Sequence, residues 1–413
     1  MVNNTLNSTK KVYSNFIIVS LLFLIYPLLA IPFIFTLIKT NARYAYLYLS
    51  IFMGYVGMLY PPVGDYYRYV QDFGIYSTLS FSELSLFFAI KTDFIMPIFF
   101  WVLGKVGCDP GITRFLYNFI GYYLIFSIFH SITNNSTYND NGKRFFLFIL
   151  LMLYVSFRLF LSRFGLSTIL FVYGIHRIYS NGKYGWFFIL LSACHHFSFA
   201  VLFLLVFVAR NINFQGSKRL TLTLLIISLV FVSDVISPVL NALSGSSMII
   251  DHIFYYVDGY YANEYYEDHS LKFRLMTLFS RLAYFVPLLY FYINFEKSRM
   301  AGLINCLMLL LVIVAPFKGI TGRFEGVTQM ILLIYMIRHF YHNIVVHRRL
   351  LRKIVLITGV FICFVNIWGS RRELSISNEN KLLLPTYYIV TSTYTEDWLG
   401  THVDDKGAPI LDF

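Results

Sequence analysis

The stretch VYSNFIIVSLLFLIYPLLAIPFIFTLI runs from Val12 to Ile38 and contains no charged residue. A helix needs about 20 consecutive apolar residues to cross a bilayer. This run is also longer than the apolar core of a secretory signal peptide, which is typically about 7 to 15 residues. It therefore predicts a first membrane-spanning helix.

Similar runs fill most of the 413 residues, of which 58% are hydrophobic and only 13% charged. Soluble domains carry about 25% charged residues. The fold class expected is therefore all-α, a polytopic bundle of about 11 to 13 transmembrane or re-entrant helices. The apolar runs centre on residues 15–38, 44–62, 94–104, 115–132, 145–157, 164–176, 184–209, 220–233, 275–295, 300–317, 326–341 and 354–370.

The formal net charge of +12 fits a membrane protein, because cytoplasmic loops carry an excess of Lys and Arg. No nucleic-acid partner is expected. Placing the basic connectors inside gives a transmembrane domain over residues 1–370 with outer loops at 63–93 and 234–274. Residues 371–413 form an outer tail, and the Lys318–Glu325 turn is outside too. Single, scattered cysteines show neither a disulfide framework nor zinc spacing.

Two runs do not fit simple spanning helices. Residues 94–104 are too short to span and suggest a re-entrant or interfacial helix. Residues 184–209 carry His195 and His196 near their centre, so this run could be two short helices that meet there.

The segment PPVGDYYRYVQDF, residues 61–73, places Asp65 and Arg68 three positions apart where an apolar run ends. At this spacing on a helix the two side chains could simply pair. Alternatively they line, with Tyr67, the entrance to an outer saccharide site. Asp258 and Tyr260 lie in a second loop rich in tyrosine and acid. That loop is either an interfacial aromatic belt or a saccharide platform.

Several arginines lie at the outer ends of apolar runs. Arg158 and Arg163 flank LFLS, whereas Arg274 and Arg281 are two helical turns apart, with Arg281 several residues into an apolar run. Each could be a helix-end residue whose charge reaches water. The functional alternative is diphosphate binding, because a guanidinium matches phosphate oxygens bidentately. Arg323 and Glu325 stand among glycines in FKGITGRFEGVTQ, either as a local ion pair in a loop or as part of the site.

The pentapeptide CHHFS, residues 194–198, puts two histidines in an apolar setting. Adjacent histidines on a helix point about 100° apart, and a zinc pair would prefer positions i and i+4. A general base or a hydrogen-bond donor to substrate is the better functional interpretation, against that of ordinary core histidines. Arginines, a base and many tyrosines together suit a large hydroxylated substrate that carries a diphosphate.

At these residues the sequence resembles a known family. The stretches GDYYRYVQDF (64–73), RFGLSTILFVYGIHRIYSNGKYGWFFILLSACHHFS (163–198) and GRFEGVTQMILLIYM (322–336) are similar to the EpsG/Wzy-type polysaccharide (O-antigen) polymerases. The resemblance implies a multi-pass bacterial inner-membrane protein that joins undecaprenyl-diphosphate-linked oligosaccharide units at its periplasmic face. It implies no metal and no cofactor. The partners expected are the lipid-linked oligosaccharide, membrane lipids and a chain-length regulator.

The resemblance also assigns roles. Arg163 matches the helix-opening arginine and would bind diphosphate, and Arg323 matches a later arginine. His196, with Ser198 two residues on, is the first choice of base, and the adjacent His195 leaves open which histidine acts. Asp65 and Tyr67 match the first-loop pattern and would shape the acceptor site, with Asp65 as a further catalytic candidate. The residue types alone add Arg158, Arg274 and Arg281 for diphosphate, and Arg68, Asp258, Tyr260 and Glu325 for saccharide. The alternatives are a flippase for lipid-linked sugars, an O-antigen ligase or other lipid-linked glycosyltransferase, and a membrane acyltransferase.

Overall fold

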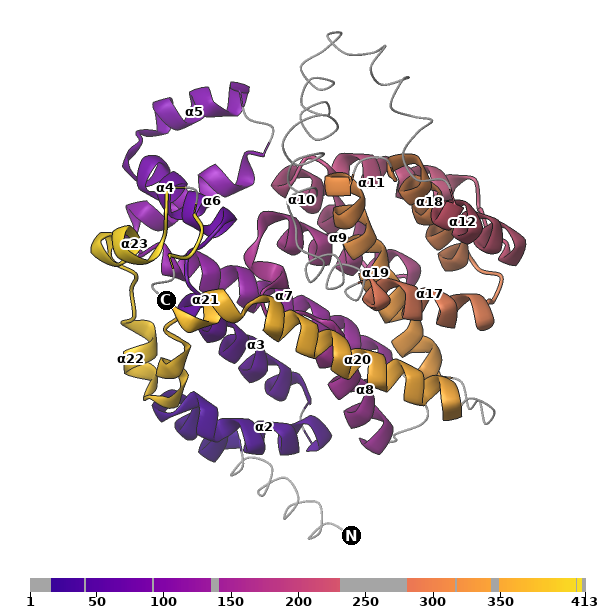
Figure 1. The fold of residues 1–413 in the computed structure, drawn as a ribbon, viewed down its shortest axis with the longest axis horizontal. Helices are drawn as coiled ribbons and strands as arrows, with labels where there is room; N and C mark the ends of the chain where they lie inside the picture. The colour runs from indigo at the N-terminus through magenta and orange to yellow at the C-terminus, as the bar shows by residue number, and fades with distance from the viewer. Residues whose placement is uncertain are drawn as a thin grey trace. The chain divides into compact units, whose positions relative to one another are not determined.

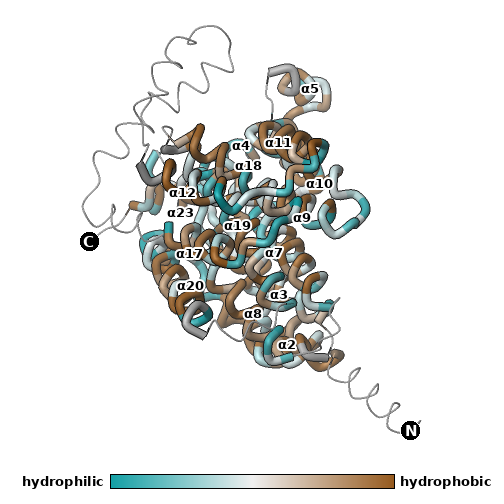
Figure 2. The backbone as a smooth tube through the Cα atoms, turned by 90° about the vertical axis from the view of Figure 1, so that its right-hand side faces the viewer, coloured by the Kyte–Doolittle hydropathy of each residue, from teal (hydrophilic) through white to brown (hydrophobic). Residues whose placement is uncertain are grey.

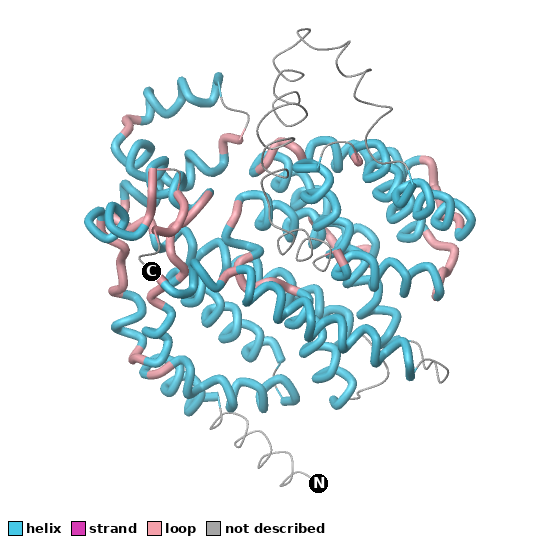
Figure 3. The backbone as a smooth tube through the Cα atoms, viewed as in Figure 1, coloured by secondary structure: helices cyan, strands magenta, loops and turns pink. Residues whose placement is uncertain are grey.

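A computed structural model of the chain describes residues 16–40, 42–90, 93–134, 141–230, 281–315, 318–342, 349–405 and 407–410. Within these ranges the fold is all-α, as predicted. The one β feature there is an isolated bridge between Val403 and Pro409 near the C-terminus (Figure 3). The predicted outer loop 234–274, with Asp258 and Tyr260, and Arg274 lie outside the described residues.

The chain divides into two compact units. The first comprises Met1–Ile149, Val155–Phe199 and Ile367–Phe413, and the second Leu150–Tyr154 and Ala200–Asn366. The division falls inside three helices, α8 (Asn141–Tyr154), α20 (Arg349–Gly369) and α11 (Phe199–Asn211), and of α11 only Phe199 belongs to the first unit. Figure 1 labels the helices of both units.

The first apolar run forms two helices rather than the single spanning helix expected. One covers Phe16–Ile25, and α2 covers Pro27–Thr40. Tyr26 lies between them. Proline at the first position of a helix is favoured because its missing N–H would have no partner there anyway, and here Pro27 starts a new helix. The prediction failed because hydropathy alone does not register this break.

The centre of the first unit is a pair of packed helices, α3 (Ala42–Leu59) and α7 (Gly111–Asn134). Buried Asn118 on α7 donates from Nδ2 to the carbonyl oxygens of Met53, at 3.0 Å, and Phe157, at 3.2 Å. The prolines at 61 and 62 follow α3 after Tyr60. They cannot donate to the carbonyls of the last turn, so the helix ends at Leu59.

The predicted outer loop 63–93 is largely helical, which corrects its interpretation as a loop. It contains α4 (Asp65–Thr78) and α5 (Phe81–Ile90), and α6 (Ile95–Lys105) follows. On α4, Phe73 and Tyr76 lie on one face and pack with Phe100 of α6 in an apolar cluster. The short run at 94–104 is thus a helix, as expected, and packs against α4.

The segment that carries the histidines forms two short helices, as the sequence suggested. α10 covers Gly185–His195 and α11 covers Phe199–Asn211. α10 packs on α9 (Arg163–Tyr179). A Cβ on Gly174 of α9 would lie 2.7 Å from the carbonyl oxygen of Gly185 on α10. This close approach of two backbones requires glycine at the contact.

The C-terminal tail is part of the first unit and packs on its helices. It forms α21 (Arg371–Ser375), α22 (Thr386–Val390), α23 (Glu396–His402) and two connecting turns, one of them the 3₁₀ helix η2 (Glu379–Leu383). The Gly64 N–H donates to the Gly407 carbonyl at 2.6 Å, and the Asn378 N–H donates to the Leu59 carbonyl at 3.3 Å. The tail therefore covers the end of α3 and the start of α4.

The second unit contains α12 (Lys218–Val230), α17 (Leu282–Ile293), α18 (Arg299–Val314) and α19 (Lys318–His342). α19 packs against both α17 and α18. The predicted turn at Lys318–Glu325 is instead the beginning of α19. Arg281 is the residue before α17 rather than a position deep in an apolar helix.

Two helices in the described part of the chain are long and apolar enough to cross a membrane, namely Gly111–Asn134 and Arg352–Gly369. Seven shorter apolar helices, of 10 to 17 residues, accompany them. Hydrophobic residues predominate along α17 and α20 (Figure 2). The described residues thus confirm the all-helical fold, and the expected 11 to 13 transmembrane or re-entrant helices stay a prediction.

Candidate functional site

The candidate site is built around the first residue of α9. Ser162 caps this helix, because its hydroxyl accepts the Gly165 N–H at 3.0 Å. Arg163 follows as the opening residue. A Cβ on Gly165 would lie 1.7 Å from the Leu159 carbonyl oxygen, so glycine lets the preceding 3₁₀ turn, η1 (Leu159–Leu161), fold back against the helix start.

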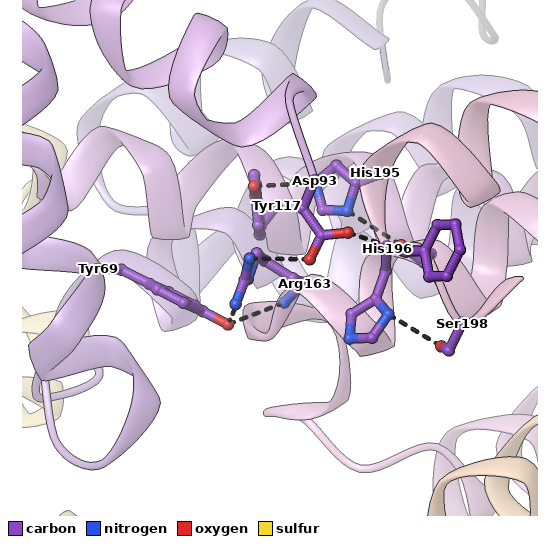
Figure 4. A network of polar contacts seen from close by, with 9 residues as sticks. Tyr69, Asp93, Tyr117, Arg163, His195, His196 and Ser198 are labelled. Atoms are coloured by element: carbon purple, nitrogen blue, oxygen red, sulfur yellow. Dashed lines mark hydrogen bonds and ion pairs between the residues drawn. The ribbon is translucent and has the colours of Figure 1, made fainter. Parts of the chain in front are cut away.

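Arg163 forms an ion pair with Asp93, whose carboxylate oxygen Oδ2 lies 3.3 Å from Nη1 (Figure 4). The side chains of Arg163 and Asp93 are 32% and 21% exposed, respectively. Such a pair is sheltered from water but accessible to a substrate. An anionic ligand could therefore replace Asp93 at the guanidinium.

Tyr69 of α4 holds the other side of Arg163. Its hydroxyl oxygen accepts from the Arg163 backbone N–H and from Nε, both at 3.4 Å. The guanidinium carbon also lies 5.5 Å from the centre of the Tyr69 ring, within the range of a cation–π contact. Backbone and side chain of Arg163 are thus fixed by one residue, which orients the guanidinium before any ligand binds.

Asp93 joins the arginine to the histidine segment. Its second oxygen, Oδ1, accepts the Phe197 backbone N–H at 2.7 Å. Phe197 lies in the break between α10 and α11, directly after His196. His196 has extended backbone angles, φ −148° and ψ 112°, so the helix ends at His195 and the two imidazoles separate.

His195 is buried, with 3% of its surface exposed. Its Nε2 lies 2.9 Å from the Tyr117 hydroxyl and its Nδ1 lies 3.0 Å from the Ser167 hydroxyl. Both ring nitrogens are therefore engaged, one with α7 and one with α9. This environment is typical of a histidine that positions helices.

His196 is half-buried on the same side as Arg163 (Figure 4). Its Nδ1 lies 2.9 Å from the Ser198 hydroxyl, and its ring meets the Phe164 ring edge to face with centroids 5.4 Å apart. The serine two residues on thus orients the imidazole. If Nδ1 carries the proton in its hydrogen bond to Ser198, Nε2 is the basic nitrogen of the ring.

The EpsG family model matches residues 42–380. The chain belongs to the EpsG family. No curated protein and no solved structure matched the sequence. Membership suggests a polysaccharide-polymerase-like function at a membrane, with a lipid-linked saccharide as substrate.

Some of the predicted site residues of this EpsG-family protein lie elsewhere in the first unit. Asp65 and Arg68 pair with each other at 4.0 Å on the exposed side of α4, with both side chains 62% exposed. Tyr67 packs in the apolar cluster under the tail, and Arg158 pairs with Glu373 of the tail at 3.5 Å. These contacts of Asp65, Arg68, Tyr67 and Arg158 do not involve the histidines.

Three others belong to the second unit. Arg281 pairs with Glu325 at 3.9 Å, and Arg323 lies on α19 two residues before that glutamate. The sequence placed Glu325 beside Arg323 in a loop. The helix instead directs Glu325 to the residue that precedes α17, because residues two apart on a helix face different directions.

Sequence reasoning about the EpsG-family motifs missed Asp93, Tyr69, Tyr117 and Ser167. Asp93 is a lone acid two residues before the apolar helix α6, which marks it as a polar position but does not indicate its partners. Tyr69 lies inside the quoted GDYYRYVQDF motif, two residues beyond the tyrosine that was chosen. Within the described ranges no group of three or more His, Cys, Asp or Glu side chains is arranged to hold a metal ion.

Proposed function

We propose that the protein is a polymerase that joins undecaprenyl-diphosphate-linked oligosaccharide units into O-antigen or a related polysaccharide at the outer face of the bacterial inner membrane. The observation that carries the proposal is the cluster of Arg163, Asp93, Tyr69 and His196 in a chain of the EpsG family. It offers a cation for a diphosphate beside a base for a sugar hydroxyl.

The reaction needs three events at the anomeric carbon of the growing chain. A hydroxyl oxygen of the incoming unit forms a bond to this carbon, and the bond from the carbon to the diphosphate oxygen breaks. Undecaprenyl diphosphate leaves with the electron pair, and the hydroxyl proton passes to the base. Arg163 would stabilise the charge of the leaving diphosphate, and His196 would take the proton.

The diphosphate is already a good leaving group, so the protein supplies mainly orientation and charge stabilisation. A positioned base contributes about 10²- to 10⁴-fold. Losing one charge-stabilising donor costs on the order of 3 to 4 kcal/mol. Tyr69 and Asp93 fix Arg163 in place beforehand, which reduces the reorganisation that binding requires.

A membrane location is supported by the surface of α20. Its residues Ile357, Val360, Phe364 and Ile367 are 50 to 67% exposed and recur at helical spacing along one face. Val355 and Ile362, on the opposite face, are buried. An apolar stripe of this kind is stable against lipid but costly in water.

The experiment that tests the proposal is a gel of surface polysaccharide from a strain that lacks the gene. A ladder that collapses to single repeat units on their carrier supports polymerisation as the lost step. If no repeat unit reaches the surface, the proposal fails and a flippase, ligase or other lipid-linked glycosyltransferase takes its place. Complementation with the wild-type chain must restore the ladder in either case.

A further inference from the structure

The C-terminal tail exposes an apolar surface that the proposed chemistry does not use. The stretch LLLPTYYIVTSTYT, residues 382–395, contains no charged residue. Five of its large side chains are 41 to 69% exposed, namely Leu383, Leu384, Tyr387, Tyr388 and Val390. Contiguous apolar surface of this kind marks a site of interaction with another protein or with a membrane.

The short helix α22 carries most of this surface. Its residue Ile389 is fully buried, whereas Tyr387, Tyr388 and Val390 are exposed on the other side of the helix. A helix at a water-facing surface turns polar residues outward. Residues 387–390 of α22 are instead apolar on both faces, which is typical of a segment whose outer face does not meet bulk water.

Hydrogen bonds hold this segment in a defined place. The Asn378 N–H and the Tyr394 hydroxyl both donate to the Leu59 carbonyl, so the tail leaves the end of α3 and returns to it. Between these two contacts, the Thr386 hydroxyl donates to the Phe23 carbonyl at 3.0 Å. η2 packs against α2 and α3, and α22 packs against α3 (Figure 1). The apolar surface therefore belongs to a fixed part of the first unit.

The contact at Phe23 joins α22 to the helix Phe16–Ile25, which belongs to the run predicted to enter the membrane. The Phe23 carbonyl can accept from the tail because Pro27, four residues on, has no N–H. Three residues at helical spacing on this helix are 54 to 67% exposed, namely Ile17, Leu21 and Leu24. An exposed apolar stripe of this kind fits lipid, so α22 lies beside a helix that is itself suited to contact the bilayer.

The level of the contact along α3 indicates which part of the bilayer is involved. The Phe23 ring lies 6.0 Å from the ring of Tyr55, about one turn before α3 ends at Leu59. Tyrosine is enriched at the headgroup level of membranes, because its ring is apolar and its hydroxyl polar.

We propose that residues 383–390 dock into the interfacial region of the lipid bilayer and anchor the tail there. The bilayer fits this surface better than a second copy of the chain does, because the neighbouring helix also exposes an apolar face. An anchor of this kind lies in the plane of the membrane surface and does not span the bilayer. The proposal concerns the place of the tail and does not depend on the reaction that the protein catalyses.

The first test measures thiol reactivity in the purified full chain in lipid nanodiscs. A charged, water-soluble thiol reagent is applied to L383C, Y387C and E396C, and mass spectrometry of the labelled peptides separates these positions from the native cysteines. Glu396 is exposed on α23 and serves as the control in water. L383C and Y387C should react at least about 10-fold more slowly than E396C, because lipid excludes the reagent and an apolar environment suppresses the thiolate. Equal rates at the three positions would place the patch in water and overturn the proposal.

The second test detects lipid directly, because a protein seated on the patch would also slow the labelling. Y387W and E396W each add one tryptophan to the four native ones. The fluorescence that each variant gains over the wild type is compared in nanodiscs of ordinary lipids and of lipids with brominated acyl chains. The brominated lipids should quench the added fluorescence of Y387W and leave that of E396W unchanged.

Slow labelling of Y387C without quenching of Y387W would mean that protein covers the patch, and the proposal would fail. Equal quenching of Y387W and E396W would overturn the assignment to residues 383–390, because the whole tail would then lie in lipid. Melting temperatures close to that of the wild type show that the variants fold. If a cysteine variant does not fold, the exchange of one aromatic residue for another in Y387W decides. A patch found in water would remove the anchor and leave the polymerase standing.

Discussion

Asp93 links Arg163 and the backbone N–H of Phe197 through its two carboxylate oxygens, at 3.3 Å and 2.7 Å. One carboxylate thus connects the start of α9 to the break between α10 and α11. Arg163, which opens α9, and His196 carry the resemblance in this region. Asp93 lies outside both motifs and fixes their relative positions. The ion pair itself is partly exposed and contributes at most about 1 kcal/mol to stability.

We expect D93N to lower polymerisation by about 10- to 100-fold while the protein level stays normal. The amide can still accept the Phe197 N–H, but it no longer neutralises or orients the guanidinium. The measurement is the ladder from a deletion strain complemented with the variant, alongside an immunoblot. E396Q, which changes an exposed acid on α23, serves as the control and should leave the ladder intact. A full ladder from D93N would remove Asp93 from the site.

R163K should abolish chain extension almost as completely as R163A. Lysine keeps the charge but lacks the fork that contacts Tyr69 and Asp93, and it cannot grip a diphosphate bidentately. The loss expected is about 100-fold or more, on the order of 3 kcal/mol. R299K makes the same exchange at an exposed position and should leave chain extension unchanged. Activity in R163K close to wild type would mean that only net charge matters there.

Substitutions of the two histidines should cause different kinds of defect. H196Q is expected to stop polymerisation at normal protein level. H195A should instead lower the protein level, because it leaves the Tyr117 and Ser167 hydroxyls without a partner in the interior, at about 1 to 3 kcal/mol each. Immunoblots and ladders from both strains make the comparison. A normally expressed but inactive H195A beside an active H196Q would reverse the assignment.

The sequence predicted site residues only where they lie at a helix end that neighbouring residues define. Arg163 opens a helix because Ser162 is a strong N-cap, and both residues are adjacent in the chain. The break between His195 and Ser198 likewise follows from polar residues inside an apolar run. Asp93 could not be assigned this way, because its two partners lie 70 and 104 positions away.

The fold class followed from composition, but the lengths of the helices did not. Hydropathy treats Val12–Ile38 as one run, whereas Pro27 starts a new helix inside it. α4 is amphipathic rather than apolar, so this part of the segment 63–93 was interpreted as a loop. Phe73 and Tyr76 nevertheless recur at helical spacing and pack on α6. A search for apolar membrane-spanning runs overlooks helices of moderate hydropathy.

G165A should destabilise the site through its backbone. A Cβ there meets the Leu159 carbonyl oxygen, so η1 and the start of α9 must separate, and Arg163 moves with them. The expected cost is about 2 kcal/mol or more, with loss of the ladder. G322A is the matched control on α19, where a Cβ meets nothing within 4 Å and alanine favours the helix. Thermal unfolding of both purified variants checks the difference, and a G165A protein as stable as G322A would contradict the close approach.

Glu379 makes the stability of the folded tail depend on pH. Burial raises the pKa of its carboxyl to about 7, and its Oε1 has no hydrogen-bond partner. The folded state therefore binds this proton more tightly than the unfolded state, whose glutamate has an ordinary pKa near 4.3. The stabilisation is fully present below that value and is lost as pH rises through about 7. E379Q, which stays neutral, should remove this component. The Tm of E379Q is expected to exceed that of the wild type by a margin that grows from pH 5 to pH 8. A difference in Tm that does not change with pH would show that Glu379 is ionised in the folded tail throughout.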